Sequence, residues 1–247
     1  DSVAVGYQAL NATTTGIKNI AIGRGSLLNN STASENVAVG YAALVSNTTA
    51  IGNVAVGHNS LYTNTASNNT ACGHSAVQLN TTGTGVTGIG KSALFNNSTG
   101  DNNTAVGKGC ISSNTTGAAN TAVGSEALDA NTTASYNTAI GRSTLGLNTT
   151  GEMNTSVGSN SLDANTTGSN NTATGVNALG ANTTADSNTA IGHEALKANT
   201  TGGSNVAVGA YALDANTTAG VNTAVGMYAL SAATTGGENT GIGYEAL

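Results

Sequence analysis

The 247-residue chain has no tryptophan, no proline and very few charged or aromatic side chains. Only 7% of its residues are charged, whereas an ordinary soluble protein carries roughly a quarter. The net charge of −6 argues against nucleic-acid binding, which needs a basic stripe. No apolar run approaches the length of a membrane span, and no signal-peptide pattern opens the chain. Disorder is also excluded, because 38% of the residues are hydrophobic and they are regularly placed.

The residues that are present recur with a fixed period. Fifteen glycines, which we call the corner glycines, follow one another at intervals of seventeen residues, with a single interval of sixteen. They are Gly6, Gly23, Gly40, Gly57, Gly73, Gly90, Gly107, Gly124, Gly141, Gly158, Gly175, Gly192, Gly209, Gly226 and Gly243. Such regularity is typical of a solenoid or array. We therefore expect residues 1–247 to form a single repeat domain, uncapped at both ends and part of a longer fibre.

The repeat has the consensus N-T-A-V-G-x-x-A-L-x-x-N-T-T-G-x-x, which we number 1 to 17 from the first Asn. Position 4 is Val or Ile in thirteen copies, position 2 is always Val, Ile or Thr, and position 9 is Leu in thirteen copies. Side chains alternate in a strand, so positions 2 and 4 share one side and the small position 3 takes the other. We expect positions 2, 4 and 9 to fill the interior of the chain.

This pattern predicts an all-β fold. Seventeen residues are too few for two helices, and the apolar spacing of a single helix is missing. The β-branched run, the corner glycine and the Asn-Thr-Thr-Gly segment favour two short strands joined by turns. We expect a parallel β-solenoid of about fifteen 17-residue coils, with each corner glycine at positive φ or in close contact with a neighbour. The Asn columns at positions 1 and 12 predict hydrogen-bonded ladders between coils.

A single chain of this kind buries little apolar surface. Three aliphatic side chains per coil are too few to offset the entropy lost by seventeen ordered residues. We expect the small columns at positions 3 and 8 to pack between three chains about a common axis. No polar capping repeat protects the two ends, which predicts end-to-end stacking or a longer fibre.

The two cysteines indicate no special chemistry. Cys72 stands at position 4 and Cys110 at position 8, two coils apart, or about 9.6 Å at a strand spacing of about 4.8 Å. This distance exceeds the usual Cα separation of a disulfide. We expect both to be small core thiols without a metal or redox role, and we expect no cofactor.

Several copies of the repeat resemble a known family. The segments "SVAVG" (2–6), "NIAIG" (19–23) and "NVAVG" (36–40 and 53–57) look like the head repeats of the YadA family of trimeric autotransporter adhesins. The segment "NTAVGSEALDANTTA" (120–134) is similar to repeats of phage tail-fibre and related virion structural proteins. The resemblance implies a left-handed parallel β-roll (YadA-head-like), a homotrimer and an extracellular place on a cell or virion surface. The present repeat is longer than the usual head repeat, around "NTTG".

Positions 6 and 7 carry the most varied chemistry and form the candidate contact stripe. Its members are Tyr7, Tyr41, His58, His74, Lys91, Arg142, His193, Tyr211, Tyr228 and Tyr244. Two interpretations of the tyrosines stay open, since they can stack on sugar rings or merely cover the corner glycine. His58 and His74 belong to adjacent coils and are a candidate metal pair, although we commit to no metal site. No pair of carboxylates with a partner base and no Ser, His and Asp set recurs in register, so we expect no enzyme and no catalytic residue.

The sequence therefore predicts a non-enzymatic structural fibre or adhesin segment, forming a rigid trimeric rod with an exposed stripe for attachment. The expected partners are further copies of the chain and a glycan or protein on a host surface, with neither nucleic acid nor membrane insertion. The alternative is an ice-binding protein, because Thr recurs at positions 13 and 14 in nearly every coil. Against it, "NTT" is typical of a turn in which hydroxyls bond to local backbone.

Overall fold

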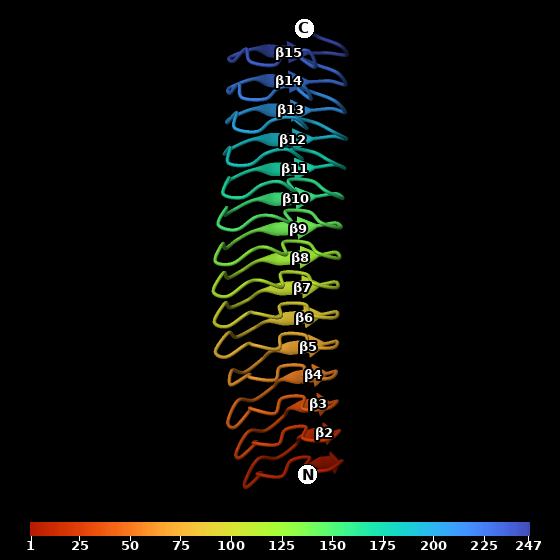
Figure 1. The fold of residues 1–247 in the computed structure, drawn as a ribbon, viewed down its shortest axis with the longest axis vertical. Helices are drawn as coiled ribbons and strands as arrows, with labels where there is room; N and C mark the ends of the chain where they lie inside the picture. The colour runs from red at the N-terminus through yellow and green to blue at the C-terminus, as the bar shows by residue number, and fades with distance from the viewer. The chain divides into compact units, whose positions relative to one another are not determined.

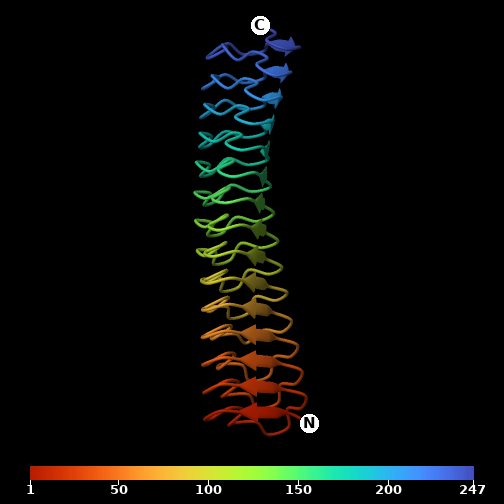
Figure 2. The same ribbon diagram turned by 90° about the vertical axis from the view of Figure 1, so that its right-hand side faces the viewer.

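The computed structural model describes residues 1–247 and confirms a parallel β-solenoid, with no helix that could cross a membrane. The chain divides into two compact units, residues 1–120 and 121–247. Within each unit the strands stack one above the next (Figures 1 and 2). The first unit contains β1 (Val3–Val5), β2 (Ile20–Ile22), β3 (Val37–Val39), β4 (Val54–Val56), β5 (Thr70–Cys72), β6 (Thr87–Ile89) and β7 (Thr104–Val106). The second contains β8 (Thr121–Val123), β9 (Thr138–Ile140), β10 (Thr155–Val157), β11 (Thr172–Thr174), β12 (Thr189–Ile191), β13 (Val206–Val208), β14 (Thr223–Val225) and β15 (Thr240–Ile242).

Each coil has one strand of three residues, at positions 2 to 4, and not the two strands that we expected. Within each unit the strands pair in parallel and in register, as Val37 with Val54 shows. The second run of the coil is not a strand because positions 7 and 9 take left-handed backbone angles, as at Ala42 (φ 51°) and Leu44 (φ 52°). These angles break the pleat, although Leu44 still donates its N–H to the carbonyl of Ser60 in the next coil at 3.1 Å.

The interior is built from positions 3, 8 and 9. In the third coil Ala38, Ala43 and Leu44 are fully buried, while Val37 and Val39 on the same strand point outward. Our expectation for position 9 is thus confirmed. The expectation that positions 2 and 4 are interior is wrong, and so is the expectation that positions 3 and 8 lie between chains. The coil is too thin to hold two β-branched side chains from its strand as well as the leucine.

The two coils that carry glycine instead of alanine at position 3 show how narrow the interior is. A Cβ added at Gly241, in position 3, would lie 2.8 Å from Cγ of Leu230. At Gly88 it would collide with Cγ2 of Val77, the β-branched residue that replaces leucine at position 9 of the preceding coil. Alanine is therefore the largest residue that position 3 accepts in most coils.

The two Asn ladders are confirmed, and both lie in the interior. At position 1, Asn36 donates its backbone N–H to Oδ1 of Asn19 at 3.0 Å and its Nδ2 to the carbonyl of Ala50 at 3.0 Å. At position 12, Asn165 donates Nδ2 to Oδ1 of Asn148 at 2.8 Å. All four of these side chains are buried at 0% exposure. Their amides satisfy backbone groups that the turns leave unpaired.

The corner glycines adopt φ values between +126° and +141°, a region that other residues rarely enter. At Gly73 an added Cβ would also lie 2.5 Å from the carbonyl oxygen of Gly90 in the next coil. Both reasons for glycine therefore hold at the same corner.

The two cysteines differ in burial. Cys110 is buried, but Cys72 is exposed. Our placement of Cys72 in the core is wrong because position 4 faces outward.

The sixteen-residue coil, residues 53–68, omits position 14 and keeps its strand in register with the next. The omission changes the turn that supplies the ladders with partners. As a result, the buried Oδ1 of Asn47 and Nδ2 of Asn53 have no hydrogen-bond partner. A shorter turn is thus accommodated at the expense of two ladder bonds.

Candidate functional site

The candidate contact stripe lies outside the corner glycines. Position 6 points outward because the corner glycine turns the chain away from the strand, and Tyr7, Tyr41 and Tyr244 are exposed at 66%, 48% and 68%. The other predicted residues are also accessible: His58, His74, Lys91, Arg142 and His193 are exposed, and Tyr211 and Tyr228 are half-buried.

Five side chains of the first unit form a continuous stack, which we call the first ladder. The Arg24 guanidinium lies 5.6 Å from the ring centre of Tyr7 and 6.0 Å from that of Tyr41, at cation–π distance. The Tyr41 and His58 rings stack at 4.9 Å, and the His58 and His74 rings stack at 5.0 Å with 4° between their planes. One side chain per coil thus repeats at the strand spacing of about 4.8 Å. The short coil does not interrupt this stack.

A second ladder runs along the second unit. The rings of His193 and Tyr211 meet edge to face at 5.2 Å, and those of Tyr211 and Tyr228 stack at 5.0 Å. Tyr244 meets Tyr228 edge to face at 6.4 Å. A hydrogen bond with the Glu245 carboxylate raises the pKa of Tyr244. Of the ten predicted residues, Lys91 and Arg142 belong to neither ladder.

The histidine pair does not have the geometry of a metal site. His58 and His74 stack ring on ring, so their ring nitrogens do not converge on one point. No group of three or more His, Cys, Asp or Glu side chains is placed to hold a metal ion.

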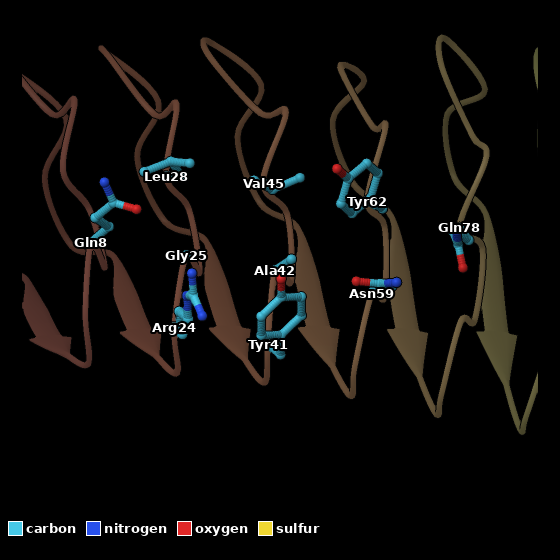
Figure 3. A pocket seen from close by; sticks show the side chains of 10 residues that line it. All are labelled: Gln8, Arg24, Gly25, Leu28, Tyr41, Ala42, Val45, Asn59, Tyr62 and Gln78. Carbon is cyan, nitrogen blue, oxygen red and sulfur yellow. The ribbon is translucent and has the colours of Figure 1, made fainter.

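Beside the first ladder lies a groove with a volume of about 390 Å³ (Figure 3). Arg24 and Tyr41, at position 6, form one wall. The floor is made by the small residues Gly25 and Ala42 at position 7. The groove exists because these two side chains are missing or short, and the neighbouring coils carry longer residues at the same position.

The opposite wall and the two ends complete the groove. Leu28, Val45 and Tyr62, all at position 10 of successive coils, form the second wall in Figure 3. The side-chain amides of Gln8, Asn59 and Gln78 close the ends. None of the polar residues that line the groove uses its side chain in a hydrogen bond within the chain, and the buried Oδ1 of Asn59 has no partner.

The equivalent positions of the second unit are predominantly acidic. A hollow of about 370 Å³ is lined by Asp163, Gly180 and Lys197, among others. Burial raises the pKa of the carboxyl groups of Asp163 and Asp214. The hydrogen bond from Lys197, at 3.0 Å, lowers the pKa of Glu194. The two units thus present opposite charge on equivalent positions.

The threonine columns differ in what their hydroxyl groups do. At position 13 the hydroxyl donates to the carbonyl of the same position in the next coil, as Thr166 does to Thr183 at 3.0 Å. At position 14 threonine occurs in thirteen coils and is exposed in each. The position 14 hydroxyls donate no such bond and are exposed to water, and exposed threonines also occur at position 2 on the outward strand face.

Part of the groove was missed by sequence reasoning. The stripe was sought only at positions 6 and 7, whereas one wall comes from position 10. A signal was present, because position 10 is Leu28, Val45 and Tyr62 in three successive coils but mostly Asp, Gly or Ser in the second unit. Reading each column coil by coil would have found it.

Comparisons with known proteins do not place the chain in a family. No protein-family model matches the sequence, and no curated protein matches it. The outward strand face, the two ladders and the groove are therefore the features that indicate what the chain does.

Proposed function

We propose that this chain is a non-enzymatic segment of a structural fibre or adhesin, in which three copies form a rigid rod on a virion or cell surface. In this arrangement the outward strand faces pack together and the contact stripe makes the attachment to a host-surface glycan or protein. The observation that carries the proposal is the apolar outward face of the strands.

This outward face consists of positions 2 and 4 and has no charged residue in any coil; position 4 is Val or Ile in thirteen of the fifteen coils, and position 2 is Thr in ten and Val or Ile in five. Its exposed aliphatic residues are Val3, Val5, Ile20, Ile22, Val54, Val56, Ile89, Val123, Ile140, Ile191, Val206, Val225 and Ile242. Single exposed apolar residues are ordinary, but a contiguous apolar strip on a regular surface marks an interface. Both units carry the strip, so the proposed contact extends along each of them.

A threefold arrangement is compatible with this face. Rotation about an axis along the solenoid keeps the three chains parallel, so equivalent coils meet at the same height. All three strips then face the axis, and the three contact stripes stay accessible. The corrected orientation of the strand supports this choice, because the residues that remain to be covered are Val, Ile and Thr and not the alanine columns.

Cys72 provides a test at the proposed axis. It is exposed at position 4, whereas Cys110 is buried. We expect sedimentation to give the mass of three chains, and a short bismaleimide to link two chains through Cys72. The Cys72→Ser variant is expected to lose the link. As a matched control, Thr184→Cys in the Cys72→Ser background places a thiol at the exposed position 14, where no link is expected. A monomeric mass, or equal linking through both thiols, contradicts the proposal.

The second candidate is an ice-binding surface, favoured by the exposed threonine file at position 14. Its weakness is that the adjacent file at position 13 donates its hydroxyls to backbone, as Thr149 does to Thr166 at 3.0 Å. Position 14 forms a single file, and the other exposed threonines share the outward strand face with the Val and Ile residues of position 4. This candidate is favoured over the rod if the wild-type chain shows thermal hysteresis and Thr→Lys variants at position 14 lose it.

A further inference from the structure

We propose that the groove beside the first ladder binds an oligosaccharide that carries an acidic group, either a carboxylate or a sulfate ester. The inference deepens the attachment role proposed above and rests on it for its biological meaning. The groove itself lies within one chain and within the first unit, so its binding is measurable whatever the oligomeric state.

The charge around the groove selects an acidic ligand. Positions 6 to 10 of the first seven coils contain no Asp or Glu, although the whole chain has a net charge of −6. The same positions carry Arg24, Lys91 and Lys108. In the second unit the equivalent positions carry six acidic residues against two cations, Arg142 and Lys197; the acidic residues are Glu126, Asp129, Asp163, Glu194, Asp214 and Glu245. An anionic ligand is therefore attracted to the first unit and repelled from the second.

Arg24 is the charged group that lines the groove. The rings of Tyr7 and Tyr41 hold its guanidinium between them, at 5.6 and 6.0 Å. No acceptor within the chain takes a hydrogen bond from it, so its planar fork is available to a ligand. Such a fork matches the two oxygens of a carboxylate or sulfate with two parallel hydrogen bonds. Because the guanidinium is already positioned, less entropy is lost on binding.

The remaining lining suits a sugar. A volume of about 390 Å³ lies within the usual range for ligand sites, roughly 300–1,000 Å³. Leu28 and Val45 offer apolar contact to the C–H faces of a pyranose ring. The amides of Gln8 and Gln78 are both donors and acceptors, as alternating hydroxyl groups require. Consecutive sugar rings also advance by about the same distance as consecutive coils.

The aromatic contact comes from a residue outside the ladder. Both faces of the Tyr41 ring already have a neighbour, Arg24 on one side and His58 on the other. Tyr41 therefore offers its edge and hydroxyl to the groove. Tyr62, on the opposite wall, makes no ring contact within the chain, and its face is free to stack on a sugar. This differs from one of the two interpretations left open for the stripe, in which its own tyrosines stack on sugar rings.

The test is isothermal titration calorimetry of the full chain with three probes of equal length: tetragalacturonate, a sulfated galactose tetrasaccharide and neutral galactotetraose. We expect at least one acidic probe to bind about tenfold or more tightly than the neutral one, and to bind more weakly at high salt. The better acidic probe identifies the anionic group. Equal affinity for the neutral probe, or no binding of either acidic probe, overturns the proposal.

Three variants locate the site. Arg24→Gln removes the charge, and Gly25→Gln fills the floor at a position where Gln8 already adopts the same backbone region (φ 58° against 67°). Both are expected to lower the affinity for the acidic probe about tenfold or more. Lys18→Gln, which removes an exposed cation of the first unit outside both the stripe and the groove, is the matched control and should bind like the wild type. Equal losses in all three variants, or none in the first two, contradict the groove assignment.

The mass of each sample, measured by sedimentation, separates this inference from the proposed function. A trimer that does not bind either acidic probe contradicts the proposed binding in the groove but not the proposed trimeric rod. A monomer that binds an acidic probe, and that loses affinity in the two groove variants only, contradicts the trimeric rod but supports the binding in the groove.

Discussion

Exchanging Asn and Val at position 1 in opposite directions tests whether the buried ladder stabilises the solenoid. Asn171 is fully buried and its Nδ2 donates to Oδ1 of Asn154 at 3.2 Å and to the carbonyl of Ala185 at 2.8 Å. Its Oδ1 accepts the backbone N–H of Asn188 at 3.0 Å. The Asn171→Val variant has a side chain of similar size and loses these three hydrogen bonds.

The expected loss follows from these bonds. Three hydrogen bonds at about 1 kcal/mol each give about 3 kcal/mol. The N–H of Asn188, left buried without an acceptor, adds about 1–3 kcal/mol, and the greater apolar burial of Val returns about 1–2 kcal/mol. We expect a net loss of about 3 kcal/mol, or a fall in Tm of roughly 6–12 °C for a chain of this size.

The reverse exchange is available in the natural chain. Val86 occupies position 1 of the sixth coil, and it is fully buried. Its own N–H is accepted by Oδ1 of Asn69 at 2.8 Å, but it has no oxygen to accept the N–H of Asn103 in the next coil. We expect Val86→Asn to restore the ladder and to raise the unfolding free energy by about 1–2 kcal/mol.

Urea unfolding followed by circular dichroism measures both changes, and hydrogen exchange at the Asn188 amide reports the ladder locally. In Asn171→Val that amide should exchange much faster, because its acceptor is gone. If Asn171→Val unfolds within about 0.5 kcal/mol of the wild type and the Asn188 amide stays protected, the ladder is not a source of stability and the reasoning fails.

Three further predictions concern the corner, the short coil and the acidic face. Gly141→Ala forces a Cβ to within 2.5 Å of a neighbouring carbonyl at φ +138°, so we expect a loss of more than about 3 kcal/mol in urea unfolding, or insoluble protein; a stable variant would contradict the close-contact argument. Inserting Thr after Thr65 restores the omitted position 14, and a higher Tm, by about 2–6 °C, is expected because the two unpaired amides regain partners. Burial raises the pKa of Asp163 and Asp214 above the usual 3.8, so their ionisation disfavours the folded state as pH rises above that value. Replacing both by Asn should raise Tm slightly at pH 7 and leave it unchanged below pH 3.8; an equal gain at both pH values would contradict this assignment.

The sequence was sufficient to predict the period, the parallel solenoid, the Asn ladders and the buried leucine column. It was not sufficient to decide which side of the strand is inside. Alternation separates positions 2 and 4 from position 3 but assigns neither set to the interior when both are apolar. The volume of the coil interior determines the orientation of the strand. Leu44 and its equivalents fill the thin coil and leave room only for a small residue such as Ala38.

The groove could be predicted only in part, for a related reason. The column pattern shows which residues recur beside one another along the solenoid. It does not show that positions 6, 7 and 10 lie on one face, because this depends on the left-handed backbone angles at positions 7 and 9. Leucine at position 9 gives no hint of such an angle, since branched and bulky residues rarely adopt it.

The ladder bonds join residues one repeat apart, as in Asn222 and Asn205, whose side chains are 3.2 Å apart and seventeen positions distant. A coil therefore depends on its two neighbours and on little else. An in-frame duplication or loss of one whole repeat in the gene would bring together two surfaces that already fit. Length then becomes a trait that recombination between near-identical repeats can adjust in fixed steps, while changes at positions 6, 7 and 10 alter what the surface recognises without disturbing the fold.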